Sequence, residues 1–103
     1  MPHRIGHNAT VTAIHELEQV LRERRSVRPP GSYSTALFSD PELIQRKIME
    51  EAFETCLELG RPDRDPSRVA SEAADLLFHL LVALVESEVA VDTVIEELER
   101  RRK

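Results

Sequence analysis

Residues 65–86 read DPSRVASEAADLLFHLLVALVE, and this stretch decides the fold. Asp65 is a typical helix N-cap, and Pro66 suits the first helical position because the N–H that it lacks would have no partner there. From Leu76 to Val85 the only polar residue is His79. A helix that is apolar on every side is covered by other helices or by a partner chain. The stretch therefore predicts the central helix of a bundle.

A second helix is predicted over about residues 41–59. Asp40 can cap it, Pro41 occupies its first position, and Gly60 directly follows its expected end. The connection to the next helix is short and rich in turn residues, which favours antiparallel packing of the two helices.

Helical spacing of apolar residues also occurs near both ends of the chain. One helix is expected from Thr10 or Thr12, either of which can cap it, to about Arg25. Another is expected over about residues 91–102, and no strand pattern occurs in the sequence. The prediction is an all-α fold, a small antiparallel helical bundle of four main helices.

The remaining segments are predicted to be irregular. Residues 1–9 are expected to form a flexible N-terminus, and residues 10–103 one domain. Residues 26–40 contain Pro29-Pro30-Gly31 and are expected to form a loop. Aromatic and aliphatic side chains in this loop indicate that it docks onto the bundle: Tyr33, Leu37 and Phe38.

Composition narrows the classes of function. The formal charge of −5 argues against a nucleic-acid binder that relies on a basic surface. Cys56 is the only cysteine, which favours a reducing compartment, and its apolar surroundings predict a buried thiol. No apolar run approaches the roughly 18 residues of a membrane span. We expect a cytoplasmic protein without nucleic-acid or membrane partners.

Four acidic residues stand at helical spacing within the two central helices. Glu51 and Glu54 are three residues apart, as are Glu72 and Asp75, so each pair shares one helical face. Both segments are otherwise apolar, and burying carboxylates is costly unless cations or hydrogen bonds compensate. Mg²⁺ prefers oxygen ligands and keeps positions for water and phosphate. The pattern therefore predicts a magnesium site and an enzyme.

The plainer interpretation of the glutamates is a solvated helix face. On a helical wheel Lys47 and the glutamates at 50, 51, 54 and 58 share one sector, and apolar residues fill most of the rest. A surface helix usually has an apolar stripe only a little wider than about 100°. The wider arc in this sequence favours acids that are enclosed by packing.

The residues around the acids resemble a known family. They are GSYSTAL at 31–37, KIMEEAFE at 47–54 and EAADLLFHLL at 72–81. Together they look like phosphoribosyl-ATP pyrophosphohydrolase, of the all-α nucleoside-triphosphate pyrophosphohydrolase superfamily, over roughly residues 12–102. The resemblance implies Mg²⁺-dependent hydrolysis of phosphoribosyl-ATP to phosphoribosyl-AMP and pyrophosphate, the second step of histidine biosynthesis.

The resemblance also implies roles for the acids. Glu51, Glu54, Glu72 and Asp75 would be the principal Mg²⁺ ligands, and Glu50 a further ligand or the group that orients the attacking water. Glu50, Glu51 and Glu54 would thus form the catalytic set. Two metal ions held in this way would neutralise a triphosphate and lower the pKa of a bound water, with cleavage between the α and β phosphates.

Further residues are predicted to contact the phosphorylated nucleotide. Lys47 either contacts phosphate or forms a helix ion pair with Glu51, and both interpretations stay open. His79 either binds substrate or is a hydrogen-bonded core histidine. Three loop residues complete the expected contacts to ribose or phosphate: Ser32, Tyr33 and Ser34.

Two departures from the family pattern affect the expected substrate. Met49 stands where glycine is common, and Phe78 where tyrosine is usual. Alternatives are therefore a related house-cleaning pyrophosphohydrolase and, from another class, a catalytically silent helical adaptor. The family also occurs fused to a cyclohydrolase with cysteine-rich zinc ligation, and because the chain has one cysteine we expect a stand-alone enzyme.

Two surface features lead to further expectations. The apolar helix at 66–86 carries more apolar surface than short partner helices cover, and the resemblance implies an intertwined homodimer, with Leu81 as an interface position. The arginine cluster at 22–28 either offsets a helix dipole or forms a polyphosphate clamp near the acids.

Overall fold

The computed structural model describes the backbone of residues 2–102 and the side chains of residues 13–102. This part of the chain contains five helices and no strand: α1 (Pro2–Val27), α2 (Tyr33–Phe38), α3 (Pro41–Leu59), α4 (Pro66–Glu86) and α5 (Val91–Arg100). The all-α prediction is confirmed, with α2 added to the four main helices. None of the described helices is long and apolar enough to span a bilayer.

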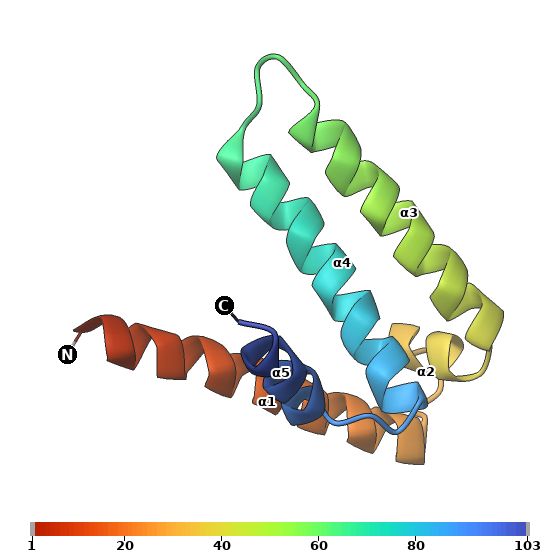
Figure 1. Ribbon diagram of the computed structural model, residues 1–103. Coiled ribbons are helices and arrows are strands. Elements are labelled where there is room, and N and C mark those ends of the chain that lie inside the picture. Colours follow the sequence, from red (N-terminus) through yellow and green to blue (C-terminus); the bar gives the residue numbers. More distant parts are fainter. Residues whose placement is uncertain (1, 103) are drawn as a thin grey trace.

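Helices α3 and α4 form the predicted antiparallel hairpin and lie side by side along their length (Figure 1). Their bounds agree with the prediction because the same start signal precedes both. Asp40 Oδ1 accepts a hydrogen bond from the Leu43 amide at 3.3 Å, and Asp65 Oδ1 accepts one from the Ser67 amide at 2.9 Å. Each bond satisfies an amide that has no partner within its helix.

Helix α1 is longer than predicted, because it starts at Pro2 instead of at Thr10 or Thr12 and continues to Val27. Its turns before residue 13 are described for the backbone alone, so the predicted capping by the two threonine side chains lies outside the described residues. The flexibility predicted for residues 1–9 stays a prediction.

The segment predicted as a loop contains a turn and the short helix α2. The Ser32 amide donates to the Pro29 carbonyl at 3.3 Å, and Gly31 has a φ of 77°. Proline followed by a residue with positive φ defines a type II turn, which glycine adopts without strain. The turn directs α2 into the bundle, where Leu37 and Phe38 are buried. The predicted docking of this segment is confirmed, although Tyr33 stays half-exposed.

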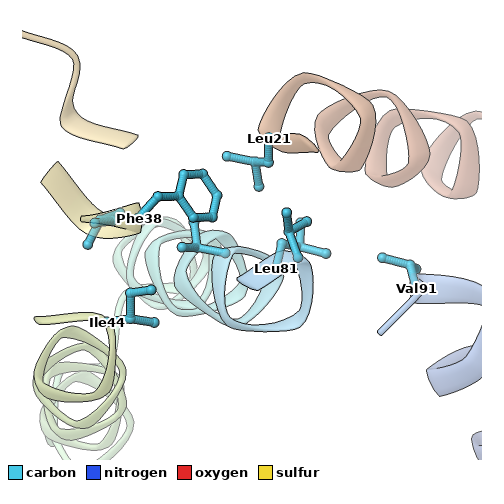
Figure 2. Packing of buried hydrophobic residues seen from close by; sticks show 8 residues of the cluster. Leu21, Phe38, Ile44, Leu81 and Val91 are labelled. Carbon is cyan, nitrogen blue, oxygen red and sulfur yellow. The ribbon is translucent and has the colours of Figure 1, made fainter. Parts of the chain in front are cut away.

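The hydrophobic core lies at one end of the hairpin, where α1, α2 and α5 surround the end of α4 (Figure 2). Its members are Leu21, Leu37, Phe38, Ile44, Leu81, Val82, Val85 and Val91. The other end of the hairpin rises away from these helices (Figure 1). We call residues 49–77 the arm and the other described residues the base.

Apolar side chains in the arm are largely exposed. Met49 and Phe53 are each 64% exposed, and Leu57 and Leu77 are exposed as well. Cys56 is also exposed, so the prediction of a buried thiol is wrong for this chain. The wide apolar arc of α3 is therefore not covered within the chain.

Leu81 was expected at a subunit interface but belongs to the core of the base, with 8% of its surface exposed. It packs within the chain because α1, α2 and α5 close around the second half of α4, as Figure 2 shows. A charge at this position would disrupt folding directly. It would therefore not report on association.

A buried carboxylate that the sequence analysis did not single out joins the first helix to the last. Glu18 Oε2 accepts a hydrogen bond from the Val91 amide at 2.8 Å and pairs with Arg22 Nη2 at 3.1 Å. Ala90, the N-cap residue of α5, has no side chain that can accept this bond. Glu18 therefore supplies from α1 the cap that α5 lacks locally.

Candidate functional site

Three of the four predicted metal ligands come together in the arm. Glu51 projects from α3, and Glu72 and Asp75 project from α4. One carboxylate oxygen from each lies within 4.8 Å of the other two. Oxygen ligands around one octahedral Mg²⁺ lie about 3 to 4 Å apart, given metal–oxygen distances of about 2.0–2.1 Å. Small side-chain rotations therefore bring this group to the spacing of a shared cation.

Buried oxygens in this group lack partners. Glu51 is 7% exposed, and its Oε2 and Glu72 Oε2 are buried without a hydrogen-bond donor among the described residues. The nearest cation to Glu51 is Lys47 Nζ, 3.8 Å from Oε1. Unsatisfied buried carboxylate oxygens are costly, and a divalent cation would compensate them. The donor set therefore fits a hard metal ion.

The electrostatic environment of Glu72 reflects the same crowding. Burial raises the pKa of the Glu72 carboxyl, and the charges of Glu54, Asp75 and Glu51 raise it further. A carboxyl with a raised folded-state pKa binds its proton more tightly in the fold than in the unfolded chain. The metal-free fold therefore loses stability as pH rises from the ordinary glutamate pKa of 4.5 towards the raised one.

Glu54 and Glu50 lie outside the group of three. Glu54 is exposed, although its charge acts on Glu72, and Glu50 is exposed and accepts a hydrogen bond from Lys47 Nζ at 3.0 Å. The expectation that packing encloses all the predicted acids is therefore wrong for Glu50 and Glu54, and it is also wrong for Asp75, which is exposed on α4. The reason is that the flanking apolar side chains of α3, such as Phe53, are themselves uncovered. Their catalytic and ligand roles stay predictions.

A further buried acid was not among the predicted site residues. Glu58 lies two turns after Glu51 on α3, and its Oε1 is buried without a hydrogen bond among the described residues. Arg61 Nε approaches this oxygen to 4.0 Å. On the helical wheel Glu58 falls in the same sector as Glu51. This shared sector is the sequence feature that could have identified Glu58 as a site residue.

Lys47 forms the ion pair that one of its two interpretations predicted. Its ammonium group lies nearer to Glu50 than to Glu51, at 3.0 and 3.8 Å. The hydrogen bond to Glu50 raises the pKa of Lys47, so the side chain is charged at neutral pH. Its contact with phosphate stays a prediction.

His79 is a hydrogen-bonded, buried histidine, as one of its two interpretations predicted. Its Nδ1 donates to the Asp75 carbonyl at 2.7 Å, so its Nε2 accepts from the Tyr33 hydroxyl, also at 2.7 Å. This chain of bonds places Tyr33 beside the acids, and burial raises the pKa of the Tyr33 hydroxyl. Tyr33 and His79 were predicted as substrate contacts independently of each other. No spacing pattern could pair positions 33 and 79.

The predicted loop contacts line a cavity of about 230 Å³ between α1, the turn before α2, and α4. Ser32 Oγ and Ser34 Oγ are 2.8 Å apart, and Arg24 Nη1 donates to Ser32 Oγ at 3.3 Å. The Tyr33 ring stacks on Phe78 with 6.3 Å between centroids. The structure thus brings Ser32, Tyr33 and Ser34 together, with Arg24 as an unpredicted neighbour.

Sequence comparison adds to this geometry. The profile of the family described as "Phosphoribosyl-ATP pyrophosphohydrolase" matches residues 14–102. The chain belongs to the phosphoribosyl-ATP pyrophosphohydrolase family. This confirms the resemblance found in the sequence.

The relatives of this chain differ in length. It is 38% identical over 93 residues to "Phosphoribosyl-ATP pyrophosphatase" of Ruegeria sp. (strain TM1040), covering 89% of this chain and 87% of that protein. It is 40% identical over 89 residues to "Histidine biosynthesis bifunctional protein HisIE" of Bacillus subtilis (strain 168), covering 85% of this chain. The chain spans 42% of the length of that bifunctional relative.

Two features bear on the earlier expectations for this family member. Met49 is exposed and lies about 160° around α3 from Glu51, so it points away from the acids.

Arg22, Arg25 and Arg28 line a separate cavity of about 570 Å³ beside the ends of α1 and α4. None of the predicted metal ligands lines it. For these three arginines, but not for Arg24, this location supports dipole compensation over a clamp near the acids.

Proposed function

We propose that this chain catalyses the Mg²⁺-dependent hydrolysis of phosphoribosyl-ATP to phosphoribosyl-AMP and pyrophosphate, in the cytoplasm and within histidine biosynthesis. Family membership supports the reaction. The observation that carries the cation is the pair of buried, unpartnered oxygens on Glu51 and Glu72. These two residues and Asp75 each place one carboxylate oxygen within 4.8 Å of the others. Carboxylates in this condition are retained where a ligand compensates them.

The residues of the chain have separate tasks in this proposal. Glu51, Glu72 and Asp75 hold Mg²⁺, with Glu54 as a fourth ligand after a side-chain rotation. When bound, the cation offsets the charge of the triphosphate and activates water for attack on phosphorus. Lys47 leaves its ion pair with Glu50 to contact phosphate, and Glu50 then orients the attacking water.

A homodimer is part of the same proposal. Met49, Phe53 and Leu57 are spaced by four residues and form an exposed apolar stripe along α3, and Leu77 is exposed on the neighbouring helix. Contiguous exposed apolar side chains mark association surfaces. A second copy of the arm covers this stripe, which lies on the face of α3 that points away from the acids.

Pyrophosphate release tests the reaction. The purified chain is incubated with phosphoribosyl-ATP and, separately, with a panel of nucleoside triphosphates, each with Mg²⁺ or with excess chelator. We expect release from phosphoribosyl-ATP that requires the cation. Equal or faster release from the triphosphates would favour the house-cleaning alternative, and activity that survives exhaustive chelation would contradict the metal site. No release from any substrate would favour the silent adaptor.

A further inference from the structure

The cavity beside Tyr33 is linked to the acids by hydrogen bonds, but none of the predicted metal ligands lines it. The Tyr33 ring forms part of its wall, while the Tyr33 hydroxyl bonds His79, whose Nδ1 bonds the Asp75 carbonyl. Tyr33 therefore stands between the cavity and the group of acids. A ligand that reaches from one to the other passes this ring.

The cavity has a size that suits part of a ligand. Sites that enclose a complete small molecule measure about 300–1,000 Å³, whereas this cavity measures about 230 Å³. Leu17, Val20 and Phe78 give it an apolar wall, and Arg24 with two serines gives it a polar edge. This division matches a phosphorylated sugar, which has a carbon framework at one end and an anion at the other.

The polar edge is held in place by the fold. The type II turn at Gly31 returns Ser32 to α1, where it accepts a bond from Arg24 and contacts the buried Ser34. Among the described residues, Arg24 forms no ion pair, whereas Arg22 and Arg25 pair with carboxylates. A guanidinium with adjacent hydroxyls is a donor set that suits phosphate.

Phosphoribosyl-ATP carries a phosphate monoester on its added ribose, which ATP lacks. The triphosphate end belongs with the acids and their cation, so the second phosphate needs a separate positive group. We propose that Arg24, Ser32 and Ser34 bind the phosphate monoester of the phosphoribosyl arm and thereby select phosphoribosyl-ATP over ATP. This inference rests on the proposed function and adds the residues that distinguish its substrate.

Binding of the reaction product tests the inference without turnover. Phosphoribosyl-AMP keeps the monoester on the added ribose, and AMP is the matched ligand without that arm. We expect the wild-type chain to bind phosphoribosyl-AMP at least about 10-fold more tightly than AMP, as hydrogen bonds to a charged group predict. Arg24→Gln removes most of that preference, Ser32→Ala removes part of it, and Arg24→Lys retains part.

Kinetics supply the second measurement. Arg24→Gln raises the KM for phosphoribosyl-ATP about 10- to 100-fold and leaves kcat within about threefold. Arg22→Gln is the matched control, because Arg22 lies on the same helix as Arg24 and does not line the cavity. Circular dichroism checks that each variant keeps its helices.

The outcomes separate the two proposals. Wild-type chain that binds AMP as tightly as phosphoribosyl-AMP, or an Arg24→Gln variant that keeps the wild-type preference and KM, overturns the monoester site and leaves the reaction standing. A wild-type chain that prefers phosphoribosyl-AMP through Arg24 but releases no pyrophosphate overturns the proposed reaction and leaves the monoester site standing.

Discussion

The base and the arm share helices α3 and α4, but they differ in how far the chain itself satisfies their side chains. In the base, Leu37 and Val82 are fully buried, and the buried Glu18 has both an amide donor and an arginine partner. In the arm, Phe53 and other apolar residues are exposed, and buried carboxylate oxygens such as Glu51 Oε2 lack donors among the described residues.

This difference indicates which part of the chain would bind a cation and a second copy of the chain. Folding of the base buries the core cluster and, among the described residues, leaves none of its buried side-chain oxygens or nitrogens without a hydrogen bond, so the base is the part that stabilises the chain. The arm leaves two kinds of unmet interaction: apolar surface, which the proposed second copy would cover, and buried carboxylate oxygens, which the proposed cation would compensate. The candidate site thus lies where a single chain is incomplete.

The largest expected effect is on the rate of catalysis by the acids of the arm. Glu51→Gln should reduce the rate of pyrophosphate release roughly a thousandfold, because losing a metal ligand removes several kcal/mol of charge stabilisation. The metal-free variant should melt no lower than the wild type, since one of three crowded carboxylates loses its charge. Steady-state assays and thermal melts measure the two quantities.

Glu96→Gln on α5 is the control for this substitution, because it removes the same charge from an exposed position in the base. A Glu51→Gln variant with near wild-type rates at saturating Mg²⁺ would show that Glu51 is not a ligand. Asp75→Asn is expected to behave as Glu51→Gln does.

The next effect is on the core of the base. Leu37→Ala should lower the free energy of unfolding by about 2–5 kcal/mol, the cost of a cavity at a fully buried leucine. Leu57→Ala deletes the same atoms at an exposed position in the arm and should cost less. Urea denaturation at two protein concentrations distinguishes them, because only the arm variant should show a concentration-dependent cost. If both variants lost the same free energy of unfolding at both protein concentrations, the distinction between base and arm would be wrong.

A smaller effect is expected on association. Phe53→Asp places a charge on the exposed apolar stripe and should weaken the proposed dimer about 10-fold or more while the helical content stays unchanged. Sedimentation at micromolar concentration provides the measurement. Val27→Asp is the matched control, since Val27 is an exposed apolar residue at the end of α1. A wild-type chain that is monomeric and fully active would rule out the dimer.

The smallest effect compares two equivalent caps. Asp40→Ala should cost about 1 kcal/mol of global stability, because Asp40 caps α3 next to the core. Asp65 makes the same kind of bond at the tip of the arm, where the first turn of α4 can open locally. Asp65→Ala should therefore speed hydrogen exchange at residues 67–69 with little change in the melting temperature. A larger melting shift for Asp65→Ala would contradict this ranking.

Local signals made the two central helices predictable. Asp40-Pro41, Asp65-Pro66 and Gly60 fix their ends, and these residues act through bonds within a few positions of themselves. The short helix α2 was missed because its serines, threonine and preceding prolines are typical of a loop. Its helical form depends on burial of Leu37 and Phe38 against other helices, which no local pattern reports.

The candidate site was predictable where its residues follow the helical spacing of the sequence. The spacing of Glu51, Glu72 and Asp75 identified residues that the hairpin brings together. The exposure of Glu54 and of Cys56 was not predictable, because an apolar wheel position does not tell whether the same chain covers it. The Tyr33–His79 bond and the Arg24–Ser32 bond depend on the turn at Gly31 and were likewise hidden.

The hydrogen bond from the Val91 amide to Glu18 has a consequence for the order of folding. It joins residues 73 positions apart, and it is the bond that caps α5 from outside its own segment. Contacts of such long separation form late, because the intervening chain must first be ordered. During synthesis α1 is made before α5, so the bond to Glu18 cannot form until residue 91 has been added. Docking of α5 therefore completes the base. If that docking is slow, the hairpin of α3 and α4 is formed while α1 is still only partly covered.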